Sequence, residues 1–181
     1  MQVVDTLIPE VKIIEPEILG DSRGFFIESY NARVIEGLLQ VDISFVQDNH
    51  SRSSKHVLRG LHYQIHQPQA KLVRVTSGAV FDVAVDIRKS SPTFGAWVGI
   101  LLSEENHKQM WIPAGFAHGF LVCSNVADFL YKTTDYYAPE HERCIAWNDP
   151  AIGIDWPIED QPLISEKDSR GSSLDDAELF A

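Results

Sequence analysis

A strict period of two between Val80 and Arg88 is the feature that most limits how this chain can fold. Every second residue of the segment is large and apolar, namely Phe81, Val83, Val85 and Ile87. Side chains of a β-strand point alternately to its two faces, so this spacing predicts a strand over residues 80–88. The Ser77-Gly78 pair just before the segment supplies a turn signal.

Short segments of similar character recur along the chain, with Gly or Pro between many of them. They predict further strands at Val11–Ile14, Phe25–Tyr30, Ile43–Asn49, Trp97–Leu102, Lys108–Ile112, Gly119–Cys123 and Ala127–Thr133. The best helical pattern is at Asn31–Leu39, where apolar side chains share one face behind Asn31 as an N-cap. Closely spaced strands with almost no helix indicate an all-β sandwich or barrel.

The length of the chain fits a single domain over residues 1–181. A chain of this size can enclose a sizeable core, and the sequence contains neither a repeat nor an interdomain linker. After about residue 157 we expect a tail that packs back over the mouth of the barrel and contains a short helix. Cys123 and Cys144 have neither metal-binding nor disulfide spacing, so we interpret both as small buried hydrophobes.

The net charge of the chain limits the kinds of molecule that it can bind. A formal net charge of −11 argues against a nucleic acid, because binding that polyanion depends on surplus Lys and Arg. A small anionic ligand is compatible with it, since a pocket needs only local positive charge. The N-terminal segment lacks a basic leader before an apolar run, and no stretch approaches the roughly 20 apolar residues of a spanning helix. We therefore expect a cytoplasmic protein with no membrane partner.

Two neighbouring segments, VLRGLHYQ at 57–64 and KLVRV at 71–75, carry Arg59, His62 and Lys71. A histidine base beside fixed cations suits proton removal next to a carbonyl, because the resulting anion needs positive charge nearby. In a regular strand Arg59 and His62 would point to opposite faces, but a bulge at Gly60 would turn both to one pocket. The alternative is a structural histidine at a basic edge of a sheet.

A turn in WIPAGFAHGFLV raises the question of a metal site. Pro113, Gly115 and His118 resemble the second motif of the cupin family, whose small β-barrels usually hold a metal with further ligands from a first motif. That motif should contain His-x-His, whereas this chain has His62-Tyr63-Gln64, His66 comes too late, and no carboxylate follows. Because metal binding needs at least three converging ligands, we expect no metal site.

Aromatic side chains gather in FLYKTTDYYAP, where Phe129 and Tyr131 share one face of a predicted strand. A phenol that faces a pocket can serve as a proton donor. Tyr137, near a loop, could stack on a flat heterocycle. Alternatively, these rings form the core and rim of a barrel.

A specific resemblance runs in order from about Val11 to Asp168. It rests on DSRGFFIESYN, FVQDNHSRS, VLRGLHYQ, KLVRV, VFDVAVDIRKSSPTFG, IPAGFAHGF and FLYKTTDYY. On these segments the chain resembles the dTDP-4-dehydrorhamnose 3,5-epimerase family. The resemblance implies a metal-independent, cupin-type double-stranded β-helix jelly roll that forms homodimers and needs no cofactor. It also implies conversion of dTDP-4-dehydro-6-deoxy-D-glucose, a dTDP-linked 4-keto-6-deoxy sugar, into dTDP-4-dehydro-L-rhamnose, a step towards surface polysaccharides.

The resemblance also implies roles for individual residues. His62 would be the base, Asp168 its orienting partner, and Tyr131 the acid on the far face of the sugar. Lys71, with Arg59, would stabilise the enolate oxygen. The substrate-binding residues implied in this way are Arg23, Phe25, Glu28, Gln47, Asp48, Asn49, Arg59, Lys71, His118, Tyr137, Glu142 and Lys167.

The substrate-binding residues implied by the resemblance are expected to contact different parts of the substrate, and some of them to do so in another subunit. Arg23, Phe25 and Glu28 are expected to reach into the pocket of a partner subunit, and Tyr137 to stack on thymine.

Other functions stay open at this point. A related 3-epimerase or 3,4-ketoisomerase would have a similar sequence, whereas a metal-dependent cupin or a sugar-binding cupin without catalysis would belong to a different class.

Overall fold

The alternating segment around Val83 forms strand β8, Ala79–Asp86, and both of its faces are buried. Phe81, Val83 and Val85 pack in one hydrophobic cluster with side chains of the C-terminal segment, such as Trp156. Val80, on the other face, belongs to a second cluster that includes residues of the opposite sheet. A polar residue on this inner face, such as Asp82, is therefore removed from solvent instead of lying on a hydrated surface.

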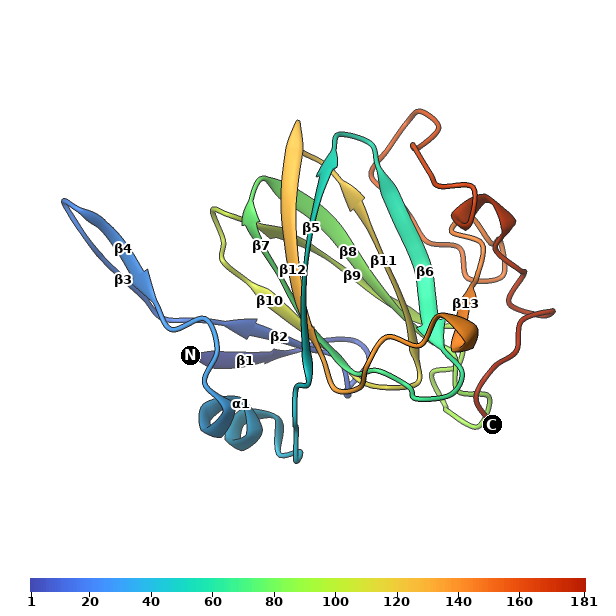
Figure 1. Cartoon of the computed structure of the whole chain (residues 1–181), viewed down its shortest axis with the longest axis horizontal. Coiled ribbons are helices and arrows are strands. Elements are labelled where there is room, and N and C mark those ends of the chain that lie inside the picture. The colour runs from blue at the N-terminus through green and yellow to red at the C-terminus, as the bar shows by residue number, and fades with distance from the viewer.

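The computed structural model describes residues 1–181 and consists mainly of two antiparallel sheets (Figure 1). In spatial order, the six-stranded sheet contains β1 (Gln2–Asp5), β2 (Lys12–Glu15), β10 (Gln109–Ile112), β7 (Lys71–Ser77), β12 (Val126–Thr133) and β5 (Gln47–Ser54). The five-stranded sheet contains β13 (Glu142–Cys144), β6 (Leu58–Gln64), β11 (Phe116–Val122), β8 and β9 (Trp97–Ser103). This is the all-β, cupin-type jelly roll that the sequence analysis predicts.

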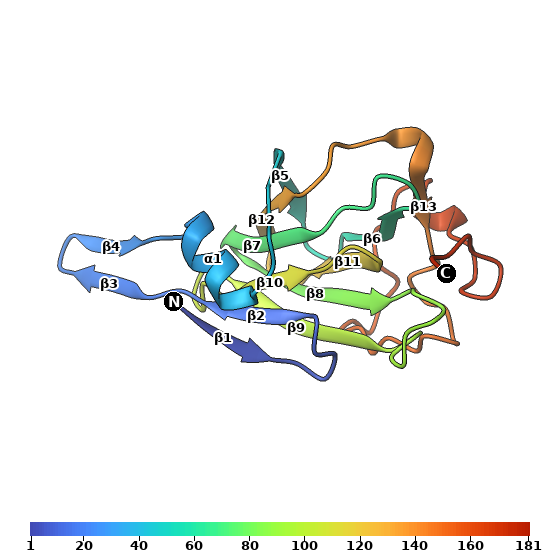
Figure 2. The same ribbon diagram turned by 90° about the horizontal axis from the view of Figure 1, so that it is seen from below.

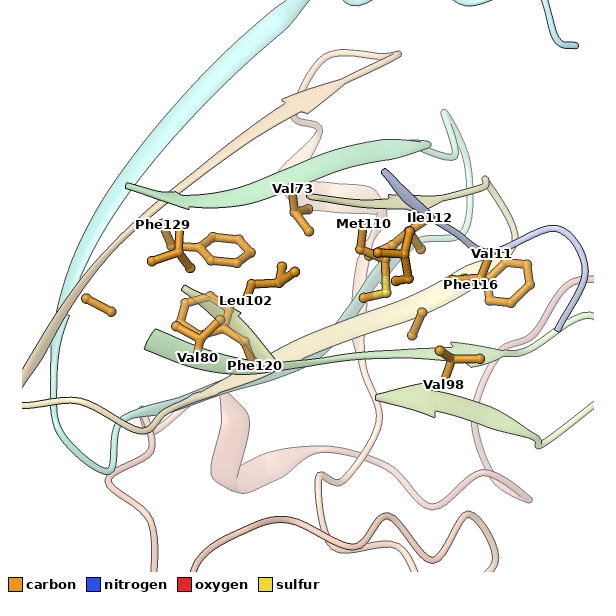
Figure 3. Close-up of a cluster of buried hydrophobic side chains, with 14 of the residues drawn as sticks. Val11, Val73, Val80, Val98, Leu102, Met110, Ile112, Phe116, Phe120 and Phe129 are labelled. Atoms are coloured by element: carbon orange, nitrogen blue, oxygen red, sulfur yellow. The ribbon is translucent and has the colours of Figure 1, made fainter. Parts of the chain in front are cut away.

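The main core fills the space between the two sheets (Figure 3). It contains sixteen buried residues, among them Val73 and Phe129 from the six-stranded sheet and Phe120 and Leu102 from the five-stranded sheet. The rings of Phe120 and Phe129 are stacked, with centroids 4.3 Å apart. The apolar core fills one part of the space between the two sheets. Polar side chains can therefore gather only in the part of that space that the core leaves free.

Helices contribute little to the fold. The predicted helix is present as α1, Ala32–Leu39, and its N-cap Asn31 accepts a hydrogen bond from the backbone N–H of Val34. Two short 3-10 helices, η1 (Pro139–His141) and η2 (Asp168–Arg170), occur near the C-terminus. None of these helices has the length and apolar character that a membrane span requires.

Several strand boundaries differ from those predicted. Strand β5 begins at Gln47 and ends at Ser54, whereas the sequence analysis predicts a strand over Ile43–Asn49. Its side chains are all polar, so hydrophobic patterning gives no signal for this strand. Pairing with β12 along its whole length defines it instead. Likewise β4 (Gly24–Ile27) ends earlier than predicted because it pairs only with β3 (Ile18–Asp21). Strand β11 begins at Phe116, three residues before its predicted start at Gly119. Strands β1, β3 and β13 are present in the structure but are not among the predicted strands.

The C-terminal segment covers the outer face of the five-stranded sheet, as Figures 1 and 2 show around β6 and β13. Leu163 forms a bridge with Val57, and Ser172 forms one with Ile145. Between these two attachments, η2 contacts β6. The segment therefore fixes the position of Asp168 beside the strand that carries His62.

A bulge in β6 sets the direction of two polar side chains. His62 pairs with His118 of β11 and Arg59 pairs with Phe120, so two residues of β6 lie opposite one residue of β11. Gly60 has a φ of +125°, and a Cβ there would lie 2.6 Å from the Cα of Gly119. The extra residue changes the alternation, and Arg59 and His62 consequently line the same cavity. The predicted irregularity at Gly60 is confirmed.

We predict that Gly60→Ala lowers the free energy of unfolding by about 2 kcal/mol or more, because it combines an unfavourable φ with a backbone clash. The control is Gly37→Ala in α1, where no atom lies within 4 Å of the added Cβ and alanine should add about 0.5–1 kcal/mol of stability. Urea unfolding of both variants measures the difference. Equal stability of Gly60→Ala and the parent protein would contradict the prediction that a side chain at position 60 strains the bulge.

Candidate active site

A cavity of about 330 Å³ is lined by side chains from both sheets. Polar and charged groups form most of its wall. The residues are Gln47, Asn49, Ser51, Arg59, His62, Gln69, Lys71, His118, Phe120, Phe129, Tyr131, Tyr137, Glu142 and Lys167. Cations, carboxylates, phenols and imidazoles in one partly enclosed space are typical of a site for a polar or anionic ligand.

On the five-stranded side, His62 of β6 is hydrogen-bonded to Asp168 of η2. The distance between His62 Nε2 and Asp168 Oδ1 is 2.5 Å. Burial acts to raise the pKa of Asp168, but the hydrogen bond from His62 and the charge of Lys167 bring that pKa below its usual value. Asp168 is therefore a carboxylate at neutral pH. It accepts the Nε2 proton, which leaves the lone pair of a neutral imidazole on Nδ1, where it can act as a base.

On the six-stranded side, Lys71 and Tyr131 lie on the neighbouring strands β7 and β12. Burial raises the pKa of the Tyr131 phenol, and the charge of Glu142 adds to this effect. The phenol therefore keeps its proton at neutral pH and can donate it. Burial lowers the pKa of Lys71 to about 8, although the carboxylates of Asp82 and Glu142 oppose this shift. Lys71 is thus a buried cation only below about pH 8.

A second histidine–carboxylate pair lies deeper in the molecule. His118 Nε2 is 3.0 and 3.1 Å from the two carboxylate oxygens of Asp82, and Asp82 is fully buried. Burial lowers the pKa of His118, and Asp82 partly offsets that effect. Asp82 is not among the predicted site residues, because it occupies a polar position of an alternating strand. A charged residue in a central strand is nevertheless a usable signal, since a buried charge needs a partner.

Three residues form a hydrogen-bonded group at the rim of the cavity. Glu142 accepts hydrogen bonds from the Tyr137 hydroxyl at 2.8 Å and the Lys167 ammonium at 2.7 Å. Burial acts to raise the pKa of Glu142, but these two donors bring it below its usual value. The hydrogen bond to Glu142, together with burial, raises the pKa of Tyr137 to about 12. The Tyr137 ring is about half exposed, so one face is available to a ligand.

Strand β5 contributes alternate side chains to the cavity. Gln47, Asn49 and Ser51 line it, and Gln47 donates to Asn49 Oδ1 at 2.9 Å. Asn49 Nδ2 is buried and has no hydrogen-bond partner within the protein. Asp48, which the sequence analysis grouped with Gln47 and Asn49, points to the other face and pairs with Lys132. The period of two in a strand explains this separation.

Three other residues implied by the resemblance lie outside this cavity. Arg23 and Phe25 are on the β3–β4 hairpin, which projects from the body of the molecule, and Glu28 follows β4 (Figure 1). The hairpin exposes the large side chains of Leu19, Phe25 and Phe26 to solvent. A projecting apolar surface of this kind is typical of a contact with another molecule.

Other cavity residues are not singled out as site residues by the sequence analysis. Ser51 could be found by extending the alternation of Gln47 and Asn49 by one step, and Phe129 shares a face with Tyr131. Gln69 and Phe120 carry no comparable signal in the sequence.

The two histidines at cupin-like positions, His62 and His118, are partners in the β6–β11 ladder. Each is already hydrogen-bonded to its own carboxylate, Asp168 or Asp82. His66, the other histidine considered as a ligand, packs edge to face against His141 and does not line the cavity. One different group has metal-ligand chemistry: His62, Cys144 and Asp168 place their ligand atoms within 4.8 Å of one another.

Comparison with known proteins points to one family. The family model described as dTDP-4-dehydrorhamnose 3,5-epimerase matches residues 5–176. A dTDP-4-dehydrorhamnose 3,5-epimerase of Pseudomonas aeruginosa is 63% identical over 180 residues, which are 99% of each chain. One of Salmonella typhimurium is 58% identical over 180 residues, covering 99% of this chain and 98% of the relative.

A solved structure shares the fold closely. It is the crystal structure of a dTDP-6-deoxy-D-glucose-3,5-epimerase from Legionella pneumophila in complex with dTDP-4-keto-L-rhamnose. It is 56% identical, aligns with a TM-score of 0.97, and the match covers 99% of this chain and 97% of that one.

We predict that Asp82→Asn lowers the pKa of Lys71 below its present value of about 8, because it removes a negative charge that favours the ammonium form. The amide oxygen can still accept the hydrogen bond from His118. Asp48→Asn, on the other face of the sheet, is the control and should leave the Lys71 titration unchanged. An NMR titration of the labelled Lys71 side chain measures both. A Lys71 pKa that stays constant or rises in Asp82→Asn would contradict this coupling.

Proposed function

The chain belongs to the dTDP-4-dehydrorhamnose 3,5-epimerase family, and we propose that His62 and Tyr131 carry its reaction from opposite faces of the sugar. The enzyme is an isomerase of dTDP-L-rhamnose biosynthesis. It epimerises C3 and C5 of dTDP-4-dehydro-6-deoxy-D-glucose and gives dTDP-4-dehydro-L-rhamnose. Of the functions that the sequence leaves open, membership in this family supports an epimerase over a metal-dependent or storage cupin.

One observation carries the assignment of the two residues. His62 belongs to the five-stranded sheet, Tyr131 belongs to the six-stranded sheet, and both line one cavity. Inversion at carbon requires removal of a proton from one face and its return to the other. A base on one wall and an acid on the opposite wall meet that requirement, whereas two groups on one wall would return the proton to its original face.

The C4 ketone makes the first step feasible at both carbons. Nδ1 of His62 takes the proton from C3 or C5, and the electron pair of that C–H bond moves to the C4 oxygen as an enolate. Asp168 stabilises the imidazolium that forms, since their hydrogen bond then becomes an ion pair. Tyr131 protonates the enolate carbon from the other side, and exchange with water restores both residues. The reaction leaves the oxidation state of the substrate unchanged, so no redox cofactor is part of this proposal.

Lys71 is the group that we assign to the enolate oxygen, with Arg59 as its neighbour on the opposite sheet. Lys71 is nearly buried, and a cation in such a place interacts strongly with an anion that forms during the reaction. Preorganised donors of this kind typically contribute about 3–4 kcal/mol to catalysis. Removing the Lys71 charge would therefore raise the barrier to proton removal at C3 and C5 alike.

The nucleotide half of the substrate would occupy the rim. Lys167 at the rim can meet the phosphates, and the exposed face of Tyr137 can stack on thymine, whereas the more deeply placed His118 can meet the sugar. The unpartnered Nδ2 of Asn49 supplies a buried donor for a substrate oxygen. Asp48 is not included, because its side chain faces away from the cavity.

A homodimer would complete the site. The projecting β3–β4 hairpin carries Arg23 and Phe25, and its exposed apolar side chains suit burial against a second copy. In a symmetric dimer, Arg23, Phe25 and Glu28 of each subunit would then contact the nucleotide in the other subunit's cavity. We assign the enzyme to the cytoplasm, because its proposed substrate is a charged nucleotide sugar that does not cross a membrane unaided.

The function and the two roles are tested with dTDP-4-dehydro-6-deoxy-D-glucose in deuterated water. The parent enzyme should introduce deuterium at both C3 and C5, whereas exchange at C3 alone would indicate a 3-epimerase. Tyr131→Phe should retain exchange through His62 but lose net inversion by about 100-fold or more, the typical share of one general acid. His62→Asn should abolish exchange at both carbons. Inversion of both centres by Tyr131→Phe at the parent rate would show that another group is the acid.

The shared site is tested by mixing two inactive variants. In a mixed dimer of Arg23→Ala and His62→Asn, one cavity would carry both defects and the other would carry neither. After exchange of subunits we expect about a quarter of the parent activity, because half of the dimers are mixed and each has one intact cavity. Two variants that stay inactive on mixing, although light scattering shows exchanged dimers, would place Arg23 in the cavity of its own chain.

A further inference from the structure

Cys144 lies directly beside the proposed catalytic pair, and none of the proposed catalytic steps uses it. Strand β13 pairs with β6 so that Cys144 is opposite His62, and Cys144 Sγ is 3.9 Å from Asp168 Oδ1. We propose that His62, Cys144 and Asp168 form a binding site for a thiophilic divalent cation such as Zn²⁺, and that this cation inhibits the enzyme. The inhibition rests on the proposed function of His62, whereas the binding does not.

The ligand types and their positions suit zinc. Imidazole, thiolate and carboxylate are the three classes of protein ligand that Zn²⁺ uses, with bonds of about 2.0–2.3 Å. Two ligand atoms on a tetrahedral ion with such bonds are about 3.3–3.7 Å apart. Here all three ligand atoms lie within 4.8 Å of one another, with 2.5 Å between Nε2 and Oδ1 and 3.9 Å between Sγ and Oδ1. Small side-chain rotations would bring all three distances into the required range.

The charges also balance. A Cys144 thiolate and the Asp168 carboxylate neutralise the two positive charges of the ion, and water can occupy the fourth position. Glu142 adds a further carboxylate nearby, although it already pairs with Lys167. This site differs from the cupin pattern sought in the sequence, because it uses only one cupin-position histidine and takes its other ligands from β13 and η2.

A route to the site exists beside the substrate cavity. Cys144 lines a second cavity of about 430 Å³, which shares Glu142 and Lys167 with the first. His62 lines the substrate cavity. The three ligands therefore lie between two cavities, and an ion can approach Cys144 from the second cavity.

Binding of the cation would remove the base by a defined change in protonation. The Cys144 thiol releases its proton to water and its sulfur bonds to the ion. The ion also takes the Nε2 lone pair of His62, so the imidazole proton moves through water from Nε2 to Nδ1. An imidazole coordinated through Nε2 and protonated on Nδ1 has no lone pair left for C3 or C5. The hydrogen bond between His62 and Asp168 is lost at the same time.

Co²⁺ and Zn²⁺ probe the site in different ways. Cobalt bound to a thiolate gives a near-ultraviolet charge-transfer band, which reports binding without an activity assay. We expect this band in the parent enzyme and in Cys123→Ala, which removes the other free and partly buried cysteine. It should be absent from Cys144→Ala and weaker or absent in Cys144→Ser, which preserves the size of the side chain.

The inhibition is measured as the Zn²⁺ concentration that halves the epimerase rate, with recovery on addition of a chelator. Cys144→Ala should retain the basal rate and require at least about 10-fold more Zn²⁺, since even outer-shell partners of a metal contribute 10–100-fold. Cys123→Ala should behave like the parent. The proposal is wrong if Cys144→Ala binds cobalt or is inhibited as the parent is, or if the parent shows neither effect. If the proposed catalytic role of His62 were wrong, the Cys144-dependent cobalt band would still appear without inhibition.

Discussion

The burial of ionisable groups inside a β-sandwich is the constraint on which the rest of this structure depends. Lys71, Asp82, His118 and Asp168 are each less than a tenth exposed, and an unpaired charge in such a place costs several kcal/mol. The fold meets this cost with fixed partners: Asp168 for His62, Asp82 for His118, and nearby carboxylates for Lys71. The same pairing holds the polar side chains in the positions that proton transfer needs, so the stability of the core and the reactivity of the cavity have one physical origin.

Much of the fold could be predicted from the chain because its signals are local. The alternation in β8 and the Asn31 cap of α1 depend only on neighbouring residues, and both features are present. Strand β5 could not be placed correctly, since its polar side chains serve a cavity and an exposed sheet edge and carry no hydrophobic period. The short strand β13 exists through pairing with the distant strand β6, which no local pattern describes, whereas β1 is only four residues long and pairs with the next strand, β2.

Some residues of the candidate site could likewise be predicted from the sequence, and others could not. His62 and Arg59 could be grouped from residues alone, because Gly60 between them marks the irregularity that turns both to one side. Asp168 has no such signal, since an acidic residue in an acidic tail reads as a surface charge, and only the family resemblance singled it out. Residues whose importance comes from a non-local contact, such as Asp82 and Cys144, required the three-dimensional arrangement.

The attachment of the C-terminal segment has a consequence for the order in which the enzyme is made. All the strands of both sheets precede residue 145, so the two-sheet body can assemble before Asp168 is available. A nascent chain can therefore present a nearly complete cavity in which His62 lacks its carboxylate. His62 would gain its carboxylate only when the C-terminal segment closes over the outer face of the five-stranded sheet, so the base would be oriented after the rest of the cavity has formed.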